Sequence, residues 1–257
     1  MLRLPVSGLD VRLRVPDGHD DVLMAESPIG APLLLALVGR LASLEDGSPL
    51  DPGGLPVADL EVILVALRQA LLGDRLMGEA RCPAASCGRP MDVTFELDEY
   101  LVSRQPRRLA SVVDAPEPGW FTRSGDGGAF RLPDGDDLLA IDGVAKAERV
   151  LTVRCLRPAN GGRATGPWRR RAESAMQAMA PTLSGRIQGT CPECHAGAEF
   201  WFDVRSFVLA ELRAHAIWVF DDVHRIAGRY GWPEAAILAL PRTRRLRYAE
   251  LIRGEAA

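Results

Sequence analysis

Lysine is almost absent from this sequence, because Lys146 is the only one among 31 lysine and arginine residues. A lone lysine in the segment GVAKAE excludes a phosphate-binding loop of the G-x-x-x-x-G-K-[ST] type. The motifs G-x-G-x-x-G, H-E-x-x-H and G-x-S-x-G are also missing. The aspartate pairs at 20–21 and 136–137 remain as candidate acid–base groups, but aspartates at such turns more often cap helices. We therefore expect a protein that is not an enzyme and takes no small-molecule substrate.

The sequence also lacks a strong net charge and a long apolar run. The formal net charge is only -3, so no overall field directs the protein to nucleic acid or to an anionic membrane. No apolar run reaches about 18 residues, which predicts that no helix spans a membrane. The opening segment MLRLPVSGLDVRLRV alternates in character and has no apolar core of a secretory signal. We expect a cytoplasmic protein whose thiols stay reduced.

Four of the five cysteines form two pairs, and each pair opens with Cys-Pro. A C-x4-C pair and a C-x2-C pair are spacings typical of zinc knuckles, and each pair is followed by an alternating, strand-like segment. Neither pair alone completes a tetrahedral site. We predict that both pairs together hold one structural Zn²⁺ per chain through Cys82, Cys87, Cys191 and Cys194.

Other assignments of the cysteines remain open at this point. The four thiols can be ordinary core residues of two hairpins, or His195 can complete one of two separate metal sites. Cys155 has no partner at knuckle spacing and is interpreted as a buried apolar thiol.

A repeated pattern links the two cysteine pairs. RVPDG at 14–18 returns as RLPDG at 131–135, and each copy is followed by two helical stretches before its cysteines. These stretches are 31–42 and 59–72, with Asp59 as the expected N-cap, and 145–156 and 168–179. The fold class is therefore predicted as α+β, a tandem duplication of a helix-helix-β-hairpin unit with a zinc knuckle, followed by a C-terminal helical arm. The predicted domains are a first unit (1–104), a Pro/Gly-rich linker loop (105–128), a second unit (129–205) and the arm (206–257).

The arm is expected to begin with a helix from 206 that ends at Gly231. A short helix between Pro233 and Pro241 follows, and then a third helix with Leu246, Leu251 and Ile252 facing inward. A helix-turn-helix that binds nucleic acid is the alternative, because the spacing of Ala227, Gly231 and Ile237 resembles that motif and four arginines follow at 242, 244, 245 and 247. The segment EAAILAL offers few side chains that could contact bases, so a solvated arginine face is the preferred interpretation.

Several longer segments are similar to a known group of proteins. They are LRLPVSGLDVRLRVPDG, LPVADLEVILVALRQALLGDRL, CPAASCGRPMDVTFEL, CPECHAGAEFWFDVRSFVLAEL and YGWPEAAILALPRTRRLRYAELI. Together they resemble the small baseplate proteins of contractile-tailed phages, the T-even-type baseplate hub family, which also occurs in gene clusters for tail-like contractile injection systems. The sequence departs from the pattern at Cys87, where four residues separate the pair, and at His195, where glycine usually follows the second cysteine.

The resemblance implies a structural or assembly role. Its expected partners are other baseplate or tail proteins, and its expected place is the cytoplasm or an assembled tail-like particle. A membrane partner is not expected, and a zinc-ribbon or helix-turn-helix protein that binds nucleic acid is the alternative function.

Overall fold

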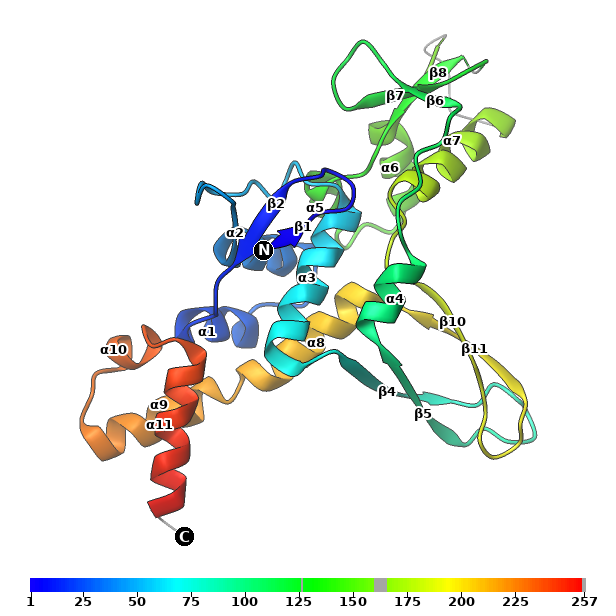
Figure 1. The fold of residues 1–257 in the computed structure, drawn as a ribbon. Coiled ribbons are helices and arrows are strands. Elements are labelled where there is room, and N and C mark those ends of the chain that lie inside the picture. Colours follow the sequence, from blue (N-terminus) through cyan, green and yellow to red (C-terminus); the bar gives the residue numbers. More distant parts are fainter. Residues whose placement is uncertain (126, 160–165, 256–257) are drawn as a thin grey trace.

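The computed structural model describes residues 1–125, 127–159 and 166–255. The predicted linker, second unit and arm also include positions 126, 160–165 and 256–257, which lie outside the described residues. Helices and small antiparallel sheets make up the fold, which confirms the α+β class (Figure 1).

The first half contains short strands and helices that lead to a β-hairpin and a short helix. In chain order the elements are β1 (Leu2–Arg3), β2 (Asp10–Leu13), α1 (Gly18–Glu26), α2 (Ala31–Leu41), β3 (Ala42–Leu44), α3 (Val57–Leu72), β4 (Arg75–Arg81), β5 (Pro90–Glu96) and α4 (Leu97–Ser103). β1, β2 and β3 form one antiparallel sheet, and β4 pairs only with β5 among the described residues.

The second half passes through its elements in the same order, with one strand added at its start. The elements are β6 (Val112–Asp114), β7 (Trp120–Arg123), β8 (Gly128–Arg131), α5 (Gly135–Ile141), α6 (Ala147–Cys155), β9 (Leu156–Pro158), α7 (Gly166–Met179), β10 (Gly185–Thr190), β11 (Gly197–Phe202) and α8 (Val204–Ala216). The sheet order β6-β7-β8-β9 extends the β1-β2-β3 pattern by one strand.

The prediction of a loop over 105–128 was wrong. β6 and β7 lie in this range and pair with each other and with β8. Val112 is buried in a small core beneath the four-stranded sheet, and Phe121 packs against the same core. The glycines and prolines that indicated a linker instead form the tight turns between these strands.

The prediction of Asp59 as an N-cap was also wrong. α3 begins two residues earlier, directly after Pro56, so that Asp59 lies in the first turn. Its buried carboxylate accepts hydrogen bonds from the backbone N–H groups of Val6 and Ser7, at 2.9 and 2.8 Å. Asp59 therefore fastens the start of the chain to α3.

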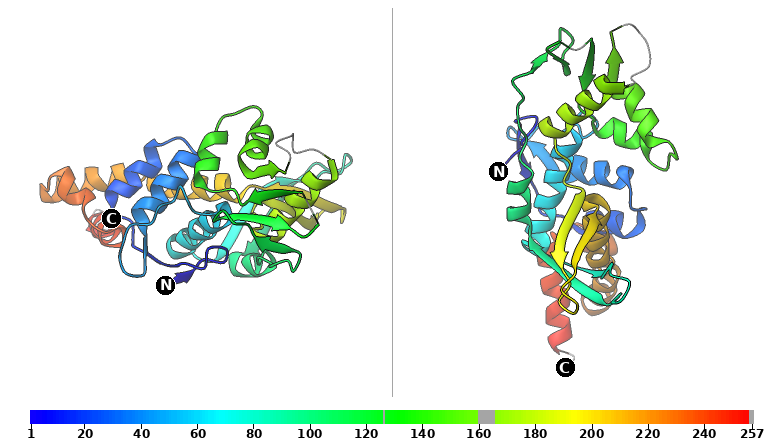
Figure 2. Two further views of the ribbon diagram at one scale, coloured as in Figure 1. Left: turned by 90° about the horizontal axis from the view of Figure 1, so that it is seen from above. Right: turned by 90° about the vertical axis from the view of Figure 1, so that its right-hand side faces the viewer.

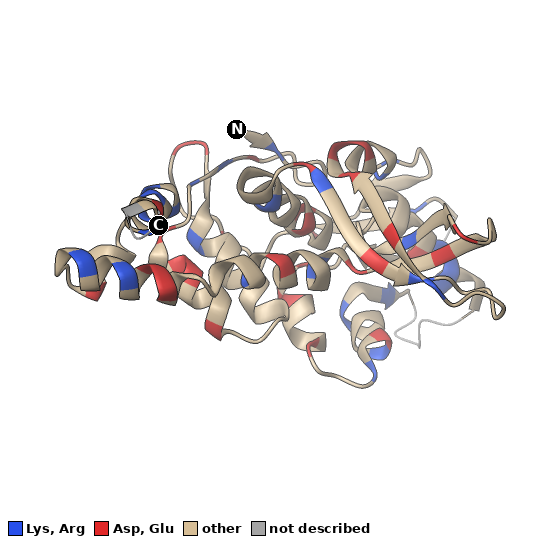
Figure 3. Ribbon diagram, turned by 90° about the horizontal axis from the view of Figure 1, so that it is seen from below, with Lys and Arg blue, Asp and Glu red and all other residues tan. Residues whose placement is uncertain are grey.

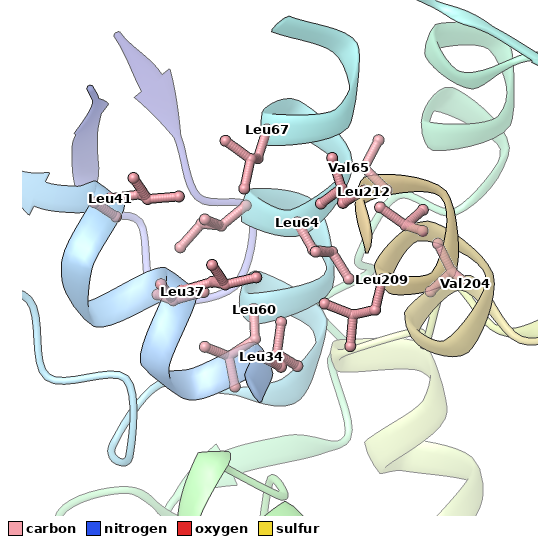
Figure 4. Packing of buried hydrophobic residues seen from close by; sticks show 14 of the residues in the cluster. Leu34, Leu37, Leu41, Leu60, Leu64, Val65, Leu67, Val204, Leu209 and Leu212 are labelled. Atoms are coloured by element: carbon pink, nitrogen blue, oxygen red, sulfur yellow. The ribbon is translucent and has the colours of Figure 1, made fainter. Parts of the chain in front are cut away.

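The main core lies between α2, α3 and α8. Leucines from all three helices interdigitate there, and Figure 4 shows Leu34, Leu60 and Leu209 within this layer. Because α8 follows the second hairpin in the chain, its burial against α3 joins the two halves. Arg68 on α3 supports the contact with a two-pronged hydrogen bond to Glu211, each at 3.1 Å.

Each half opens its first helix with the same capping arrangement. Asp17 caps α1, Asp134 caps α5, and the aspartate three residues later completes a capping box in both. These later aspartates, Asp20 and Asp137, are fully buried. Asp20 and Asp137 therefore serve helix ends, as aspartates at such turns usually do.

Two arginines hold each of these buried carboxylates. Arg14 and Arg40 contact Asp20 at 2.6 and 2.8 Å. Burial alone raises the pKa of Asp20, but hydrogen bonds from Arg14 and Arg40 and from the Asp17 amide outweigh it and hold that pKa below its usual value. The second half repeats the arrangement with Asp137, Arg131 and Arg154.

Both P-D-G turns also receive the beginning of another helix. The Pro16 carbonyl accepts a hydrogen bond from Arg242 at the start of α11 (Arg242–Glu255), at 2.8 Å. The Pro133 carbonyl accepts one from Val57 at the start of α3, at 3.0 Å. The P-D-G turn of the first half thus holds the start of α11, and the P-D-G turn of the second half holds the start of α3.

Close approach of the backbones requires glycine in both turns. A Cβ on Gly18 would lie 2.6 Å from the Cα of Leu238, and a Cβ on Gly135 would meet the carbonyl oxygen of Pro52. Any larger residue at either position would push the docked segment away.

The arm consists of α9 (Val219–Tyr230), α10 (Glu234–Leu238) and α11, and it projects from the core on the side away from the hairpins (Figures 1 and 2). The predicted helix from 206 to Gly231 is interrupted at Ile217 and Trp218, which separate α8 from α9. Gly231 ends α9 in the left-handed conformation, as predicted. No helix in the described ranges is both long and apolar enough to cross a bilayer.

Buried charges fasten α11 to the rest of the molecule. Arg245 is 1% exposed and contacts Asp21 on α1 and Asp222 on α9, the latter at 3.2 Å. Arg242 approaches Asp21 at 3.4 Å. Burial raises the pKa of both aspartates, against the opposing effect of the arginines.

The expected solvated arginine face is therefore wrong for half of the cluster. Arg242 and Arg245 are buried, while Arg244 and Arg247 are exposed. Leu251, predicted to face inward, is 44% exposed. α11 is attached by ion pairs with α1 and α9, together with aromatic packing of Tyr248 against Tyr230 and Trp232.

The buried pairs predict a large difference between two arginines of α11. We expect Arg245→Met to lower the free energy of unfolding by roughly 3–5 kcal/mol, because it leaves two carboxylates buried with too few partners. Arg247→Met is the matched control, since Arg247 is exposed and its ion pair with Glu250 is also exposed, and it should change stability by less than about 1 kcal/mol. Urea unfolding of both variants measures the difference, and equal effects would contradict this account of the arm.

Candidate metal centre

The two cysteine pairs lie in the turns of separate β-hairpins. β4 pairs with β5 and β10 with β11, both antiparallel, and each ladder ends immediately before the first cysteine of its pair. Side chains alternate between two faces along these strands, as their sequences predict, and the inner faces include Leu76, Met91 and Phe202. The inner faces of the two hairpins meet near the cysteines.

Both turns have the same local geometry despite their different lengths. The N–H of the first cysteine donates across the turn, from Cys82 to Arg89 and from Cys191 to Ala196. The residue after the second cysteine is left-handed in each, with φ of 58° at Gly88 and 57° at His195. His195 thus takes the conformation that glycine takes in the other turn, at some steric cost.

The four thiols converge on one point. Cys82 Sγ lies 3.7 Å from Cys194 Sγ, and Cys87 Sγ lies 3.9 Å from Cys191 Sγ, so each close pair joins the two hairpins. All four sulfur atoms lie within 4.8 Å of one another. Zinc–sulfur bonds of about 2.3 Å in a tetrahedron would place the sulfurs about 3.8 Å apart. The predicted cysteines are therefore brought together in a cluster that can hold one metal ion.

The surroundings of the cluster are partly apolar. Cys82 and Cys191 are buried and pack with Met91 and Ala198, whereas Cys194 is exposed. A donor set of four soft thiolates suits Zn²⁺, Cu⁺ or iron rather than a hard cation such as Mg²⁺. Four protein ligands fill a tetrahedral sphere and leave no place for a reacting water molecule.

A second contact holds the hairpins at their bases. Phe95 at the end of β5 packs edge-on against Phe202 at the end of β11, with ring centroids 5.5 Å apart. Tyr100 joins both rings and donates a hydrogen bond to the Leu183 carbonyl at 2.6 Å. The hairpins are therefore joined at the bases by aromatic packing and at the tips by the thiols.

Protons are held tightly by the first cysteine pair. The Ala84 amide lowers the pKa of Cys82, but burial and the hydrogen bonds with the other thiols outweigh it and raise that pKa to about 12. The Arg89 amide likewise lowers the pKa of Cys87, and burial and the neighbouring thiols again raise it above its usual value of 9.0.

Cys191 has the opposite tendency. Backbone N–H groups of Cys194 and Glu193 point at its sulfur and lower its pKa to about 7. Cys191 therefore tends to carry negative charge beside two thiols, Cys82 and Cys87, that keep their protons. A bound metal dication would compensate the charge of the thiolates and displace the protons.

The other candidate residues lie outside the cluster. Among the described residues, the group of potential metal ligands contains only the four cysteines, so His195 does not belong to it. Cys155 is buried as predicted, and its thiol donates to Asp137 at 3.4 Å. Sequence reasoning missed the ion pair of Arg89 with Glu193 at 3.6 Å, which links the two turns. Opposite charges within the two cysteine turns were the available signal.

The shared cluster predicts that either cysteine pair is needed for the metal. We expect one equivalent of Zn²⁺ per chain in the wild type and almost none in Cys82→Ser or in Cys191→Ser, with a fall in melting temperature of about 10 °C or more. Cys155→Ala should keep its zinc and serves as the control. Elemental analysis and thermal unfolding measure both quantities, and two zinc ions per chain, each lost separately, would rule out a shared site.

Metal affinity should fall steeply with acidification. Protons compete for the thiolates, and Cys82 and Cys87 both carry protons near neutral pH in the metal-free protein. The apparent association constant should therefore rise at least about 100-fold per pH unit above pH 7, because Cys82 and Cys87 both release protons, and more steeply below it, where Cys191 must also release one. Competition with a chromophoric chelator between about pH 6 and 8 measures the slope. A tenfold change per pH unit would show that metal binding releases only one proton.

Comparison of the chain with protein-family models, with curated proteins and with solved structures found no match. The chain's own residues and their contacts are therefore the basis on which its function is inferred.

Proposed function

We propose that this protein is a non-enzymatic scaffold in which one structural Zn²⁺ clamps two copies of a repeated unit, and that it takes part in building a contractile tail or injection-system baseplate. The observation that carries the proposal is the meeting of Cys82 and Cys87 with Cys191 and Cys194, from hairpins far apart in the chain. A metal ion held by all four cysteines would fix the β4–β5 hairpin against the β10–β11 hairpin.

Zinc is the metal proposed for this cluster. Thiolate ligands favour it, and it accepts a tetrahedral arrangement without further requirements. A four-thiolate zinc ion contributes folding free energy and offers no open position for catalysis. A scaffold role fits this chemistry better than a metal-dependent reaction does.

Duplication of one unit is supported by three correspondences between the halves. The order of elements agrees from β7 onward with the order from β1. The capping aspartates and their arginine partners recur, and so does the docking of a helix start on the P-D-G turn. Independent origins would have to produce all three, so tandem duplication is the simpler explanation.

A baseplate context is supported by the resemblance of the sequence segments and by an exposed apolar surface. Ile217, Trp218 and Phe220 lie where α8 gives way to α9, and they are 53%, 62% and 44% exposed. Large apolar side chains grouped on a surface mark sites for other proteins. The proposed partners are other baseplate or tail proteins, met in the cytoplasm or in the assembled particle.

Nucleic-acid binding is the weaker candidate. α10, which would be the recognition helix, has only five residues, and Ile237 and Leu238 within it are buried. Arg242 and Arg245 are buried in ion pairs with Asp21 and Asp222 and are therefore not free to contact phosphates. Figure 3 shows basic and acidic residues interspersed along the helices and strands, whereas phosphate binding favours a cluster of basic residues.

The baseplate proposal predicts a loss of particles when the protein is missing. Deleting the gene in a strain that produces the tail-like particles should abolish or strongly reduce intact particles in electron micrographs. Wild-type protein and Cys155→Ala should restore them, while Cys82→Ser combined with Cys191→Ser should not, because the clamp is lost. Normal particles after deletion would refute the proposal. Mass spectrometry of purified particles separates a permanent component, which is present, from an assembly chaperone, which is absent.

A further inference from the structure

A groove of about 190 Å³ lies between the two cysteine hairpins. Consecutive residues of β5 (91–95) and of β10 (187–190) line it, together with Phe200 from β11. A groove bounded by the face of a strand would be lined by every second residue, because side chains alternate. The unbroken runs therefore place the backbone edges of β5 and β10 on the groove.

Neither of these edges is paired in the part of the chain that the structure describes. β4–β5 and β10–β11 are separate two-stranded sheets, and no ladder joins them. The outer N–H and C=O groups of β5 are thus available to another strand, which is how extended peptides bind at sheet edges.

The groove is held open from both ends. The hairpins meet at the tips through the thiols, 3.7 Å apart in the Cys82–Cys194 pair, and at the bases through Phe95 and Phe202. A groove that exists before binding lowers the ordering cost of a ligand.

The chemistry of the lining indicates what would fill it. Ile187 and Phe200 form an apolar wall that is only partly buried. Asp92 lines the rim and lies directly opposite Glu79 in the ladder, with both side chains exposed. Like charges facing each other across a ladder are unfavourable, and neither carboxylate has an ion-pair partner among the described residues. A cation beside Asp92 would relieve this repulsion.

We propose that an extended segment of another protein adds a third strand to the β4–β5 hairpin along the open edge of β5. Its apolar side chains, at alternate positions, contact Ile187 and Phe200, and a lysine or arginine between them pairs with Asp92. This inference rests on the proposed role as a protein-binding scaffold and names the surface that such a partner uses.

A synthetic peptide tests the proposal on the full-length, zinc-loaded protein. The probe is acetyl-Thr-Val-Lys-Val-Thr-Val-Lys-amide, and its counterpart carries Glu in place of both lysines. Amide NMR signals of residues 91–95 and 187–190 should shift in a saturable manner with the lysine peptide, which should bind about fivefold or more tightly than the glutamate peptide. Asp92→Asn should reduce that preference, whereas Asp114→Asn, on a different sheet, should leave it unchanged.

Backbone pairing has a separate control. A strand presents its N–H groups alternately to opposite edges, so N-methylation of one alternate set in the lysine peptide should abolish binding. The proposal is overturned if millimolar peptide produces no saturable shift, if both peptides bind equally, or if neither methylated peptide loses affinity. Because the zinc content and the particle assay are measured independently, a negative result here would leave the clamp and the baseplate role standing.

Discussion

The core between α3 and α8 joins the two halves, but the placement of the two hairpin tips against each other depends chiefly on four sulfur atoms. At the hairpin tips the apolar cluster is small, and no ladder joins the two sheets. In the absence of a metal, Cys82 keeps its proton and Cys191 tends to lose its own, so the thiols form no strong bonds between the hairpins. A bound dication would convert the same four groups into metal ligands and fix the hairpin tips, as the packing of Phe95 on Phe202 fixes the bases.

The proposed duplication explains how one local arrangement serves two purposes. The capped turn, the buried aspartate and the arginine pair recur, but the position after that aspartate differs between the halves. In the first half it is Asp21, which binds arginines of the arm. In the second it is Leu138, which packs into the main core beside α2 and α3. The residue at this one position therefore differs with the helix that is docked: aspartate contacts the arginines of α11, and leucine packs in the core with α3.

Sequence reasoning was effective where the signal is local. Cysteine spacing, the repeated P-D-G turns and the end of α9 at Gly231 are each encoded within a few residues. Contacts between distant residues were less accessible. Arg245 looked solvated because its partners, Asp21 and Asp222, lie far away in the chain, and 105–128 looked like a loop because glycine and proline mark tight strand turns as well as linkers. The convergence of the cysteines was predictable only because both pairs stand at matching places in the order of elements of the two halves.

The open edge of β5 could also pair with the same edge of a second copy, because unpaired strands promote aggregation. Two copies of this protein meeting edge to edge along β5 would bring one acidic rim, with Asp92 and Glu79, against another. Their repulsion disfavours self-association, which is a common use of charge on strand edges. A strand that carries lysine or arginine meets attraction at the same place. The like-charged pair therefore costs the isolated hairpin some stability and in return selects the proposed partner over a second copy, and both consequences follow from one pair of carboxylates.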